Sequence, residues 1–272
     1  MKQAPARLLI IAGSDSSGGA GLQADIKTAT ALGAYAMTAI TAVTAQDTCG
    51  IHAIHTIPAA IVREQIAWTL ADIGADAIKI GMLGSVEIVE AVADVLAAQA
   101  KGIPVVLDPV MASTSGTPLL DDAAIAAMKA RLFPLAAVIT PNIPEAEILS
   151  GISISGIADA VRAAELLCAA GAKAVLVKDG HGKGTDVSDI LLECGSTKHH
   201  HFGSPRIDTL HTHGTGCTLA TAIAVGLGQR LELSEAVALA HRFVHEAIST
   251  APGFGAGRGP LNHMHAVPPY RL

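Results

Sequence analysis

The chain has 272 residues and a formal net charge of −6 at pH 7, and half of its residues are hydrophobic while only 3% are aromatic. This length is enough for a sizeable core in one large α/β domain or two modest ones. The Lys and Arg residues form no block, so the sequence lacks the electrostatic footprint of a surface for nucleic acid or anionic membrane. We therefore expect neither nucleic acid nor membrane as a partner.

The opening of the chain and its cysteines indicate a cellular setting. The apolar stretch at 8–12 is far shorter than a membrane span or a signal-peptide core. Cys49, Cys168, Cys194 and Cys217 are widely separated and form neither a CxxC pair nor a close-set disulfide framework. We therefore expect a protein that is not exported and that works in the reducing cytoplasm.

Short apolar runs rich in Val and Ile alternate with Ala-rich segments along the chain. The runs predict buried strands at 8–12, 77–80, 105–107, 137–139 and 174–177. The other segments predict helices at 20–32, 58–73, 86–100, 122–132, 157–170, 216–227 and 234–250. This alternation is typical of βαβ units with right-handed crossovers. We expect a three-layer αβα sandwich with a mainly parallel central sheet and some extra strand structure near 190–193.

The sequence favours one domain over the whole of 1–272. It contains neither a Pro/Ser linker nor an abrupt change in composition, and it has no internal repeat. The stretch at 253–259 has four glycines in seven residues. It therefore predicts a flexible C-terminal tail over about 253–272.

A first glycine-rich cluster, at 13–21, follows a predicted strand and opens a predicted helix. Backbone N–H groups at such a place can face a polar ligand. Gly19, Gly21 and Ala24 also fit the G-x-G-x-x-A pattern of dinucleotide sites, so a nicotinamide oxidoreductase is one alternative. The glycines, however, begin several residues after the strand, and an acidic residue for the ribose is missing about twenty positions on.

A second glycine turn, Gly214-Thr215-Gly216-Cys217, leads into another predicted helix. Its consecutive N–H groups would form an anion hole that stabilises a moving phosphoryl group. Cys217 would lie in the first helical turn, where the helix N-terminus lowers the pKa of a thiol, so it could take a proton from a substrate alcohol. The alternative is a small buried cysteine without chemistry. A Walker-type ATPase is disfavoured because the sequence contains no GxxxxGK[ST] motif.

Six motifs stand in the order found in one family: AGSDSSGGAGLQAD at 12–25, TAVTAQDT at 41–48, KIGML at 79–83, LDPVM at 107–111, TPNIPE at 140–145 and HGTGCT at 213–218. The chain thereby resembles the hydroxymethylpyrimidine and phosphomethylpyrimidine kinases of thiamine synthesis, within the ribokinase-like superfamily. The resemblance covers nearly the whole chain. It implies ATP as phosphoryl donor, Mg²⁺ as cofactor and a homodimer.

The resemblance implies a pyrimidine pocket built from several of these motifs. Gln46 is similar to the side chain that hydrogen-bonds the pyrimidine's ring nitrogen and amino group, which suits an amide with a donor and an acceptor. Its alternative role is to cap a backbone group at the end of a strand. Met82 is similar to an apolar wall of the pocket, although a plain core methionine would look the same. Gly13, Asp25 and Val110 complete the expected substrate-binding residues.

The nucleotide and its magnesium are expected at the carboxyl ends of the predicted strands, where ligands of open α/β sheets bind. Asp108 could hold Mg²⁺ through water, and Glu145 is similar to the superfamily's metal-linked acidic residue. Asn142 would support that geometry, although Asn-x-x-Glu is also an ordinary helix capping pattern. Lys178 would place a positive charge near the nucleotide phosphates. Thr215 joins Lys178 and Asn142 as an expected nucleotide contact.

The sequence departs from the family at two positions. Asp179 follows Lys178 where relatives commonly have glycine, so it could weaken nucleotide binding or pair with Lys178. Thr114 stands where a lysine is frequent, which puts one phosphate contact in doubt. The adjacent histidines at 199–201 would point to alternate faces of a strand, so we expect no metal site there.

The expected activity is ATP-dependent phosphorylation of 4-amino-5-hydroxymethyl-2-methylpyrimidine to its monophosphate and then to its diphosphate. The second step is implied by the resemblance alone. Within the kinase class the alternative is a pyridoxal kinase, since related enzymes share the HGTGC loop. A pyrimidine-binding protein that has lost turnover is a further alternative, which magnesium-dependent ATP consumption would exclude.

Overall fold

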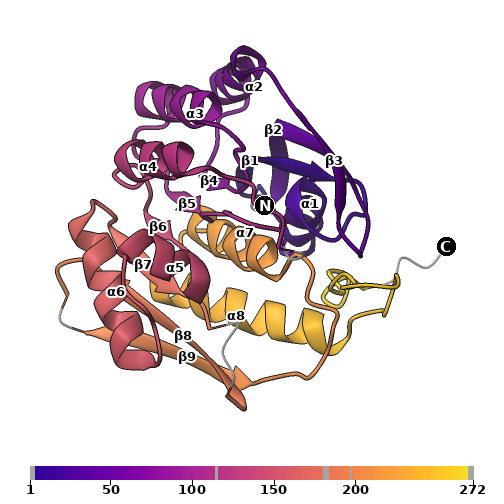
Figure 1. The fold of residues 1–272 in the computed structure, drawn as a ribbon. Coiled ribbons are helices and arrows are strands. Elements are labelled where there is room, and N and C mark those ends of the chain that lie inside the picture. The colour runs from indigo at the N-terminus through magenta and orange to yellow at the C-terminus, as the bar shows by residue number, and fades with distance from the viewer. Residues whose placement is uncertain (1–3, 114–115, 180–183, 197, 269–272) are drawn as a thin grey trace.

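The computed structural model describes residues 4–113, 116–179, 184–196 and 198–268, and it contains a three-layer αβα sandwich, as predicted (Figure 1). In these residues nine strands form one sheet in the order β3-β2-β1-β4-β5-β6-β7-β8-β9. The strands are β1 (Arg7–Asp15), β2 (Tyr35–Gln46), β3 (Ile51–Thr56), β4 (Ala77–Ile80), β5 (Val105–Leu107), β6 (Val138–Ile139), β7 (Ala174–Val177), β8 (Asp186–Glu193) and β9 (His199–Pro205).

The central part of the sheet is parallel, and its edges are antiparallel. Neighbouring strands from β2 to β7 pair in parallel, while β3, β8 and β9 pair antiparallel with their neighbours. The carboxyl ends of six parallel strands therefore meet along one edge. This is the edge where open α/β sheets bind their ligands.

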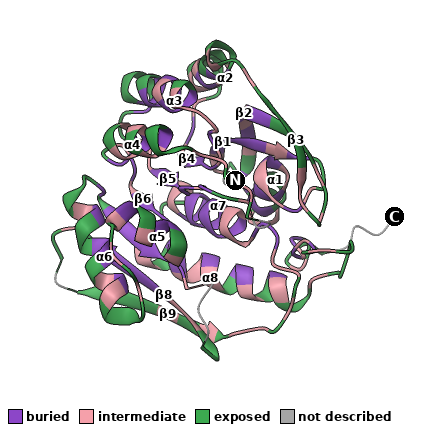
Figure 2. Cartoon of the chain, viewed as in Figure 1, coloured by how far each residue is buried: buried purple, intermediate pink, exposed green. Residues whose placement is uncertain are grey.

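Helices cover both faces of the sheet. They are α1 (Gly21–Ala31), α2 (Ala59–Asp72), α3 (Val86–Gln99), α4 (Asp122–Arg131), α5 (Ile143–Ser150), α6 (Ile157–Ala169), α7 (Thr215–Gly228) and α8 (Leu233–Ser249). Within β1, Leu9 and Ile11 pack into the core under α2 to α6, while Leu8 and Ile10 pack into the core under α1, α7 and α8. Because successive strand side chains point to opposite faces, a continuous apolar strand supplies both cores. The buried residues follow this interior (Figure 2).

The C-terminal segment was predicted to be a flexible tail, and its described part contacts the rest of the chain. Over 253–268 it packs beside the glycine turn and the loop after β2: the Arg258 N–H donates to the Thr48 carbonyl at 2.8 Å, and the His213 N–H donates to the Gly259 carbonyl at 3.1 Å. Leu261 is only 3% exposed. The glycines permit this close packing, since a Cβ at Gly257 would collide with the Thr48 backbone.

The cysteines also differ from the expectation. Cys168 at the end of α6 and Cys194 just after β8 form a disulfide across a sequence separation of 26 residues. Cys49 is free and exposed, and Cys217 is free and partly exposed. The antiparallel return of β8 along β7 brings the two bonded cysteines together, which their spacing alone did not indicate.

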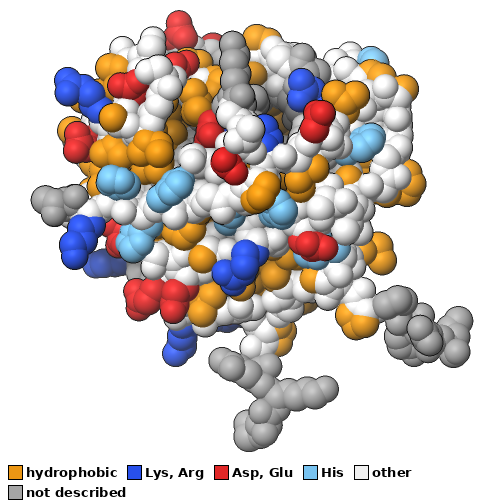
Figure 3. Space-filling model, turned by 90° about the horizontal axis from the view of Figure 1, so that it is seen from below, with side chains coloured by type: hydrophobic (Ala, Val, Ile, Leu, Met, Phe, Trp, Pro, Cys, Tyr) orange, Lys and Arg blue, Asp and Glu red, His pale blue; other side chains and the backbone are white. Residues whose placement is uncertain are grey.

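On the side seen in Figure 3, basic and acidic side chains are interspersed rather than gathered by sign. Across the part of the chain that the structure describes, none of the helices is long and apolar enough to span a bilayer.

Candidate active site

A cavity of about 770 Å³ opens at the carboxyl ends of the parallel strands. It collects residues from the first glycine cluster, from the ends of β2, β4, β5, β6 and β7, and from the start of α7. Of the predicted site residues it is lined by Gly13, Gln46, Met82, Asp108, Val110, Asn142, Glu145, Lys178, Gly214, Thr215, Gly216 and Cys217. Residues that are far apart in the sequence thus share one cavity.

Asp25 is the predicted site residue that lies elsewhere. It is fully buried beneath the cavity floor, where it accepts hydrogen bonds of 2.7 Å from the Lys79 ammonium and from the Thr221 hydroxyl. Burial raises the pKa of Asp25, and the nearby Lys79 opposes that shift. Asp25 follows the cavity-lining Gly21 by one helical turn of α1, and its side chain contacts Thr221 of α7.

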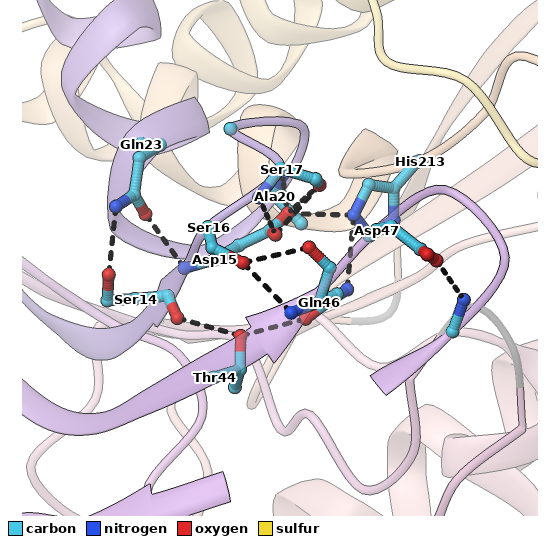
Figure 4. Close-up of polar contacts among 12 residues, drawn as sticks. Ser14, Asp15, Ser16, Ser17, Ala20, Gln23, Thr44, Gln46, Asp47 and His213 are labelled. Atoms are coloured by element: carbon cyan, nitrogen blue, oxygen red, sulfur yellow. Dashed lines mark hydrogen bonds and ion pairs between the residues drawn. The ribbon is translucent and has the colours of Figure 1, made fainter. Parts of the chain in front are cut away.

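Gln46 faces the cavity from the end of β2. Its side-chain oxygen accepts a hydrogen bond from the Thr44 hydroxyl at 3.1 Å, and its nitrogen lies 3.3 Å from Nε2 of His213 (Figure 4). The amide therefore contacts side chains, and the predicted alternative of capping a backbone group is not seen. Met82 lies beside this end of the cavity, and a Cβ at Gly13 would stand only 3.1 Å from its sulfur. Glycine at position 13 thus leaves room for Met82.

An Asp–His pair that the sequence analysis did not single out stands next to Gln46. Oδ2 of Asp15 lies 2.8 Å from Nε2 of His213, and the carboxylate also accepts hydrogen bonds from the Ser17 hydroxyl and the Ala20 N–H, each at 2.8 Å (Figure 4). Burial raises the pKa of Asp15, but these hydrogen bonds outweigh it and the pKa is lowered overall. The available signal was a carboxylate close behind a predicted buried strand, with Ser at the second position after it.

The start of α7 is shaped by two glycines. Gly214 precedes the helix with φ of +85°, and a Cβ there would collide with the Gly19 carbonyl. A Cβ on Gly216 would stand 3.3 Å from Nζ of Lys178 and 3.4 Å from Oδ2 of Asp108. The start of the helix, where N–H groups point out of its first turn, therefore lies close to a buried cation and a buried carboxylate.

Asp108 and Lys178 form an ion pair at the centre of the cavity. Nζ of Lys178 lies 2.8 Å from Oδ1 of Asp108, which also accepts a hydrogen bond from the Thr140 hydroxyl at 3.0 Å. Burial lowers the pKa of Lys178, but Asp108 and Glu145 outweigh it and raise the pKa overall. Lys178 is therefore a fixed positive charge at the centre of the cavity.

Asn142 and Glu145 form the capping box that the sequence analysis gave as an alternative. The Asn142 side chain accepts from the Glu145 N–H, and the Glu145 carboxylate accepts from the Asn142 N–H, both at 2.9 Å. Both residues also line the cavity. Burial is the main cause that raises the pKa of Glu145 to about 7, with Lys178 opposing the shift and Asp108 adding to it.

Cys217 does not have the lowered pKa that its place in the first helical turn predicted. Burial raises the pKa of the Cys217 thiol to about 11, and the positive charge of Lys79 opposes that shift most strongly. The helix N-terminus does not compensate for the loss of water around the sulfur. The resting side chain is therefore a neutral thiol at neutral pH.

The two departures from the family pattern have different outcomes. Asp179 pairs with Arg206 at 3.5 Å and accepts from the Ser188 N–H at 3.2 Å, so it does not pair with Lys178. Thr114 lies outside the described residues. Asp179 thereby joins the end of β7 to β8.

The predicted metal residues form no dedicated metal cage. Within the described ranges, His, Cys, Asp and Glu side chains make no group of three that could hold a metal ion. Mg²⁺, however, is often held by one or two carboxylates together with substrate phosphates and water. Asp108 and Glu145 both line the cavity and fit that second arrangement.

Comparison with known proteins agrees with this geometry. The family model described as phosphomethylpyrimidine kinase matches residues 15–262. The chain belongs to this family. The hydroxymethylpyrimidine/phosphomethylpyrimidine kinase of Rhizobium meliloti is 46% identical over 94% of this chain and 96% of its own length. The thiamine biosynthesis bifunctional protein ThiED of Geobacter sulfurreducens is 47% identical over 96% of the chain, which spans only 52% of that longer protein.

Solved structures of similar proteins have the same ribokinase-like fold as this chain. Pyridoxal kinase of Bacillus subtilis, in an ADP complex, superposes with a TM-score of 0.88 at 36% identity and covers 96% of this chain and 98% of its own. Phosphomethylpyrimidine kinase of Clostridium difficile superposes with a TM-score of 0.79 at 41% identity and covers 89% and 99% respectively. Fold and family are therefore the predicted ones.

Proposed function

We propose that this chain phosphorylates 4-amino-5-hydroxymethyl-2-methylpyrimidine with ATP, and then phosphorylates the monophosphate to the diphosphate, as a step of thiamine biosynthesis. The observation that carries the proposal is the placement of Gln46, Met82, Lys178 and the α7 glycine turn around one cavity. The cavity thereby combines an amide that can hydrogen-bond a heteroaromatic ring with N–H groups that can stabilise a phosphoryl group. The names of full-length relatives support the same substrates.

The two substrates would occupy different ends of the cavity. Its pyrimidine end is bordered by Gly13, Gln46 and Met82, and its other end is bordered by residues of α8 and β8 such as Val244 and Val187. We place the nucleotide at the second end. Lys178 and the start of α7 lie between the two, where the γ-phosphoryl group would meet the acceptor.

The chain's own residues would act mainly by positioning and by charge. The acceptor oxygen forms a bond to the γ-phosphorus while the bond from that phosphorus to the β,γ-bridging oxygen breaks. The N–H groups at 214–217 and the Lys178 ammonium stabilise the negative charge on the transferring group. Cys217, as thiolate, accepts the proton of the hydroxymethyl group in the first phosphorylation.

Asp108 and Glu145 are the proposed magnesium residues, through water and phosphate oxygens. The ion would supply charge neutralisation between phosphate groups when bound. A homodimer in the cytoplasm is the assembly and setting that we propose from the family. Light scattering of the purified protein tests the dimer.

The test of the proposed function is a magnesium–ATP assay on hydroxymethylpyrimidine, its monophosphate and pyridoxal side by side, with products identified by mass. We expect both pyrimidines to gain phosphate. The fold similarity to pyridoxal kinases supports pyridoxal as the second candidate. Phosphorylation of pyridoxal alone would overturn the pyrimidine assignment, and no phosphorylation of any of the three would overturn the kinase assignment.

A further inference from the structure

A charged network lies directly beneath the candidate catalytic turn. Lys79 on β4 has a fully buried side chain, and its ammonium lies 2.7 Å from the Asp25 carboxylate on α1. The other oxygen of that carboxylate accepts from the Thr221 hydroxyl on α7, also at 2.7 Å. None of these three side chains lines the cavity. A buried charge is costly even when paired, so its retention needs an explanation.

Helices α1 and α7 bring this network into register with Cys217. Gly21 precedes Asp25 by four residues, and Cys217 precedes Thr221 by four, so each pair lies on one face of its helix. Gly21 and Cys217 both line the cavity, and one turn further in Asp25 accepts a hydrogen bond from the Thr221 hydroxyl. The two helices therefore face each other at two successive levels, and a hydrogen bond joins them at the deeper one.

The ammonium of Lys79 is held in one place by its surroundings. A Cβ on Gly81 would stand 2.8 Å from Nζ of Lys79, so the backbone closes over the charged end. Asp25 is the anion that compensates it, and Thr221 orients Asp25. The charged groups that act on the Cys217 sulfur are Lys79, Asp25, Asp108 and Lys178.

We propose that Lys79 is a positioning residue for the catalytic turn, which fixes the start of α7 through Asp25 and Thr221 and holds a buried positive charge beneath that turn. The proposal rests on the proposed function only in calling Cys217 catalytic. Lys79 itself touches neither substrate, because it lies below the cavity floor. The positive charge of Lys79 lowers the pKa of Cys217, but burial raises that pKa by more.

The charge role is tested by the rate at which iodoacetamide alkylates Cys217, followed by mass spectrometry between pH 7 and 9.5. The background is Cys49→Ser, which removes the exposed free thiol. Below its pKa a thiol loses tenfold in thiolate fraction for each unit by which that pKa rises. We expect Lys79→Met to slow alkylation roughly threefold to tenfold at each pH. Thr28→Val, which removes a buried hydroxyl that bonds only within α1, should not change it.

In Lys79→Met the Asp25 carboxylate would be buried without its compensating charge, which could prevent folding. The double variant Asp25→Asn with Lys79→Met removes both buried charges and avoids this problem. Lys79 affects Cys217 more than Asp25 does, so this double variant should also be alkylated more slowly. If either folded variant is alkylated as fast as the parent, the charge role is overturned. This conclusion does not depend on whether the parent phosphorylates a pyrimidine. An inactive parent with slowed variants would instead overturn the proposed function alone.

The positioning role is tested by Thr221→Val, a change of similar shape that leaves both charges in place and is expected to fold. Loss of the bond to Asp25 should lower kcat threefold to tenfold while KM for ATP stays within twofold. Thr28→Val again serves as the control for a lost buried hydroxyl. Equal kcat in Thr221→Val and Thr28→Val would overturn the positioning role.

Discussion

The side chains of Asp15 and His213 meet at 2.8 Å, between Oδ2 and Nε2, although 198 residues separate them in the chain. The contact joins the last residue of β1 to the segment just before α7. His213 also lies 3.3 Å from the Gln46 amide, so the same imidazole contacts the proposed specificity residue. The first and the last of the ordered motifs are thus connected at the pyrimidine end of the cavity.

Asp15→Asn is expected to weaken pyrimidine binding and to lower stability by about 1–3 kcal/mol, because it removes the charge from a nearly buried, multiply bonded carboxylate. The pKa of Asp15 is lower in the folded protein than in the unfolded chain. Asp15 therefore contributes to stability at pH values above its unfolded pKa, and this contribution is lost as the pH falls through its folded pKa. Urea unfolding of parent and variant between pH 2.5 and 6 measures this. The control is Asp47→Asn: the pKa of this carboxyl is also lowered, by His52 and by the Cys49 and Gly50 N–H groups, but the group is exposed and should contribute less to stability. Equal losses in both variants would contradict the prediction.

Gln46→Ala should raise the Kd for the pyrimidine by an amount equivalent to about 1–3 kcal/mol, because ring polar atoms lose their partner. ATP binding should be unchanged, since Gln46 borders the opposite end of the cavity from the proposed nucleotide position. Calorimetric titration with each ligand checks this. Gln229→Ala removes a surface amide that bonds the Leu32 carbonyl and serves as the matched control. Equal losses for ATP and pyrimidine would show that Gln46 supports the whole site.

The sequence predicted the elements with strong apolar patterns and missed those without them. The five predicted strands are present, because runs such as 105–107 are apolar on both faces. β2 is rich in Ala and Thr, and β3 and β9 are largely exposed and contain several His residues, so none has that pattern. α5 has only eight residues, and its capping box was the visible signal.

The candidate site was predictable where a residue ends a strand, because such residues must meet at one edge of a parallel sheet. Asp25 and Cys217 differ from the prediction for another reason. A motif does not say which face of α1 a residue occupies, and a position in a helix does not say how much water reaches a sulfur. Both depend on how α1 and α7 pack together.

Cys217→Ala should reduce the first phosphorylation far more than the second. The hydroxymethyl acceptor must lose a proton, whereas the phosphate acceptor is already ionised near pH 7 because its second pKa is about 6. With a thiol pKa of about 11, the parental rate of the first step should rise with pH from 7 to 9. Single-turnover rates with each acceptor test both points. Cys49→Ser should leave both rates unchanged, and an equal loss of both steps in Cys217→Ala would remove the proposed base.

Reduction of the Cys168–Cys194 bond should lower the free energy of unfolding by about 3.5 kcal/mol, on the loop-closure relation for a separation of 26 residues. Cys168→Ser with Cys194→Ser should have the same effect, measured by urea unfolding. Cys49→Ser is the control, because that thiol is exposed. A thiol titration of the denatured, non-reduced protein should find two free thiols, and four would show that the bond is absent in solution.

Glu145→Gln should remove a pH dependence of stability without breaking the helix start, because Gln also completes a capping box. The folded pKa of Glu145 is about 7, above the ordinary 4.5. Between these values the folded state keeps a proton that the unfolded state releases, so stability from this group falls as pH rises from about 4.5 to 7. Asp189, with a pKa raised mainly by burial to about 6, acts in the same direction in both proteins. We therefore expect the free energy of unfolding, measured with urea, to fall more steeply with pH in the parent than in the variant. The difference in slope should be largest between pH 5 and 7. Identical slopes would mean that Glu145 is ionised throughout this range in the folded protein.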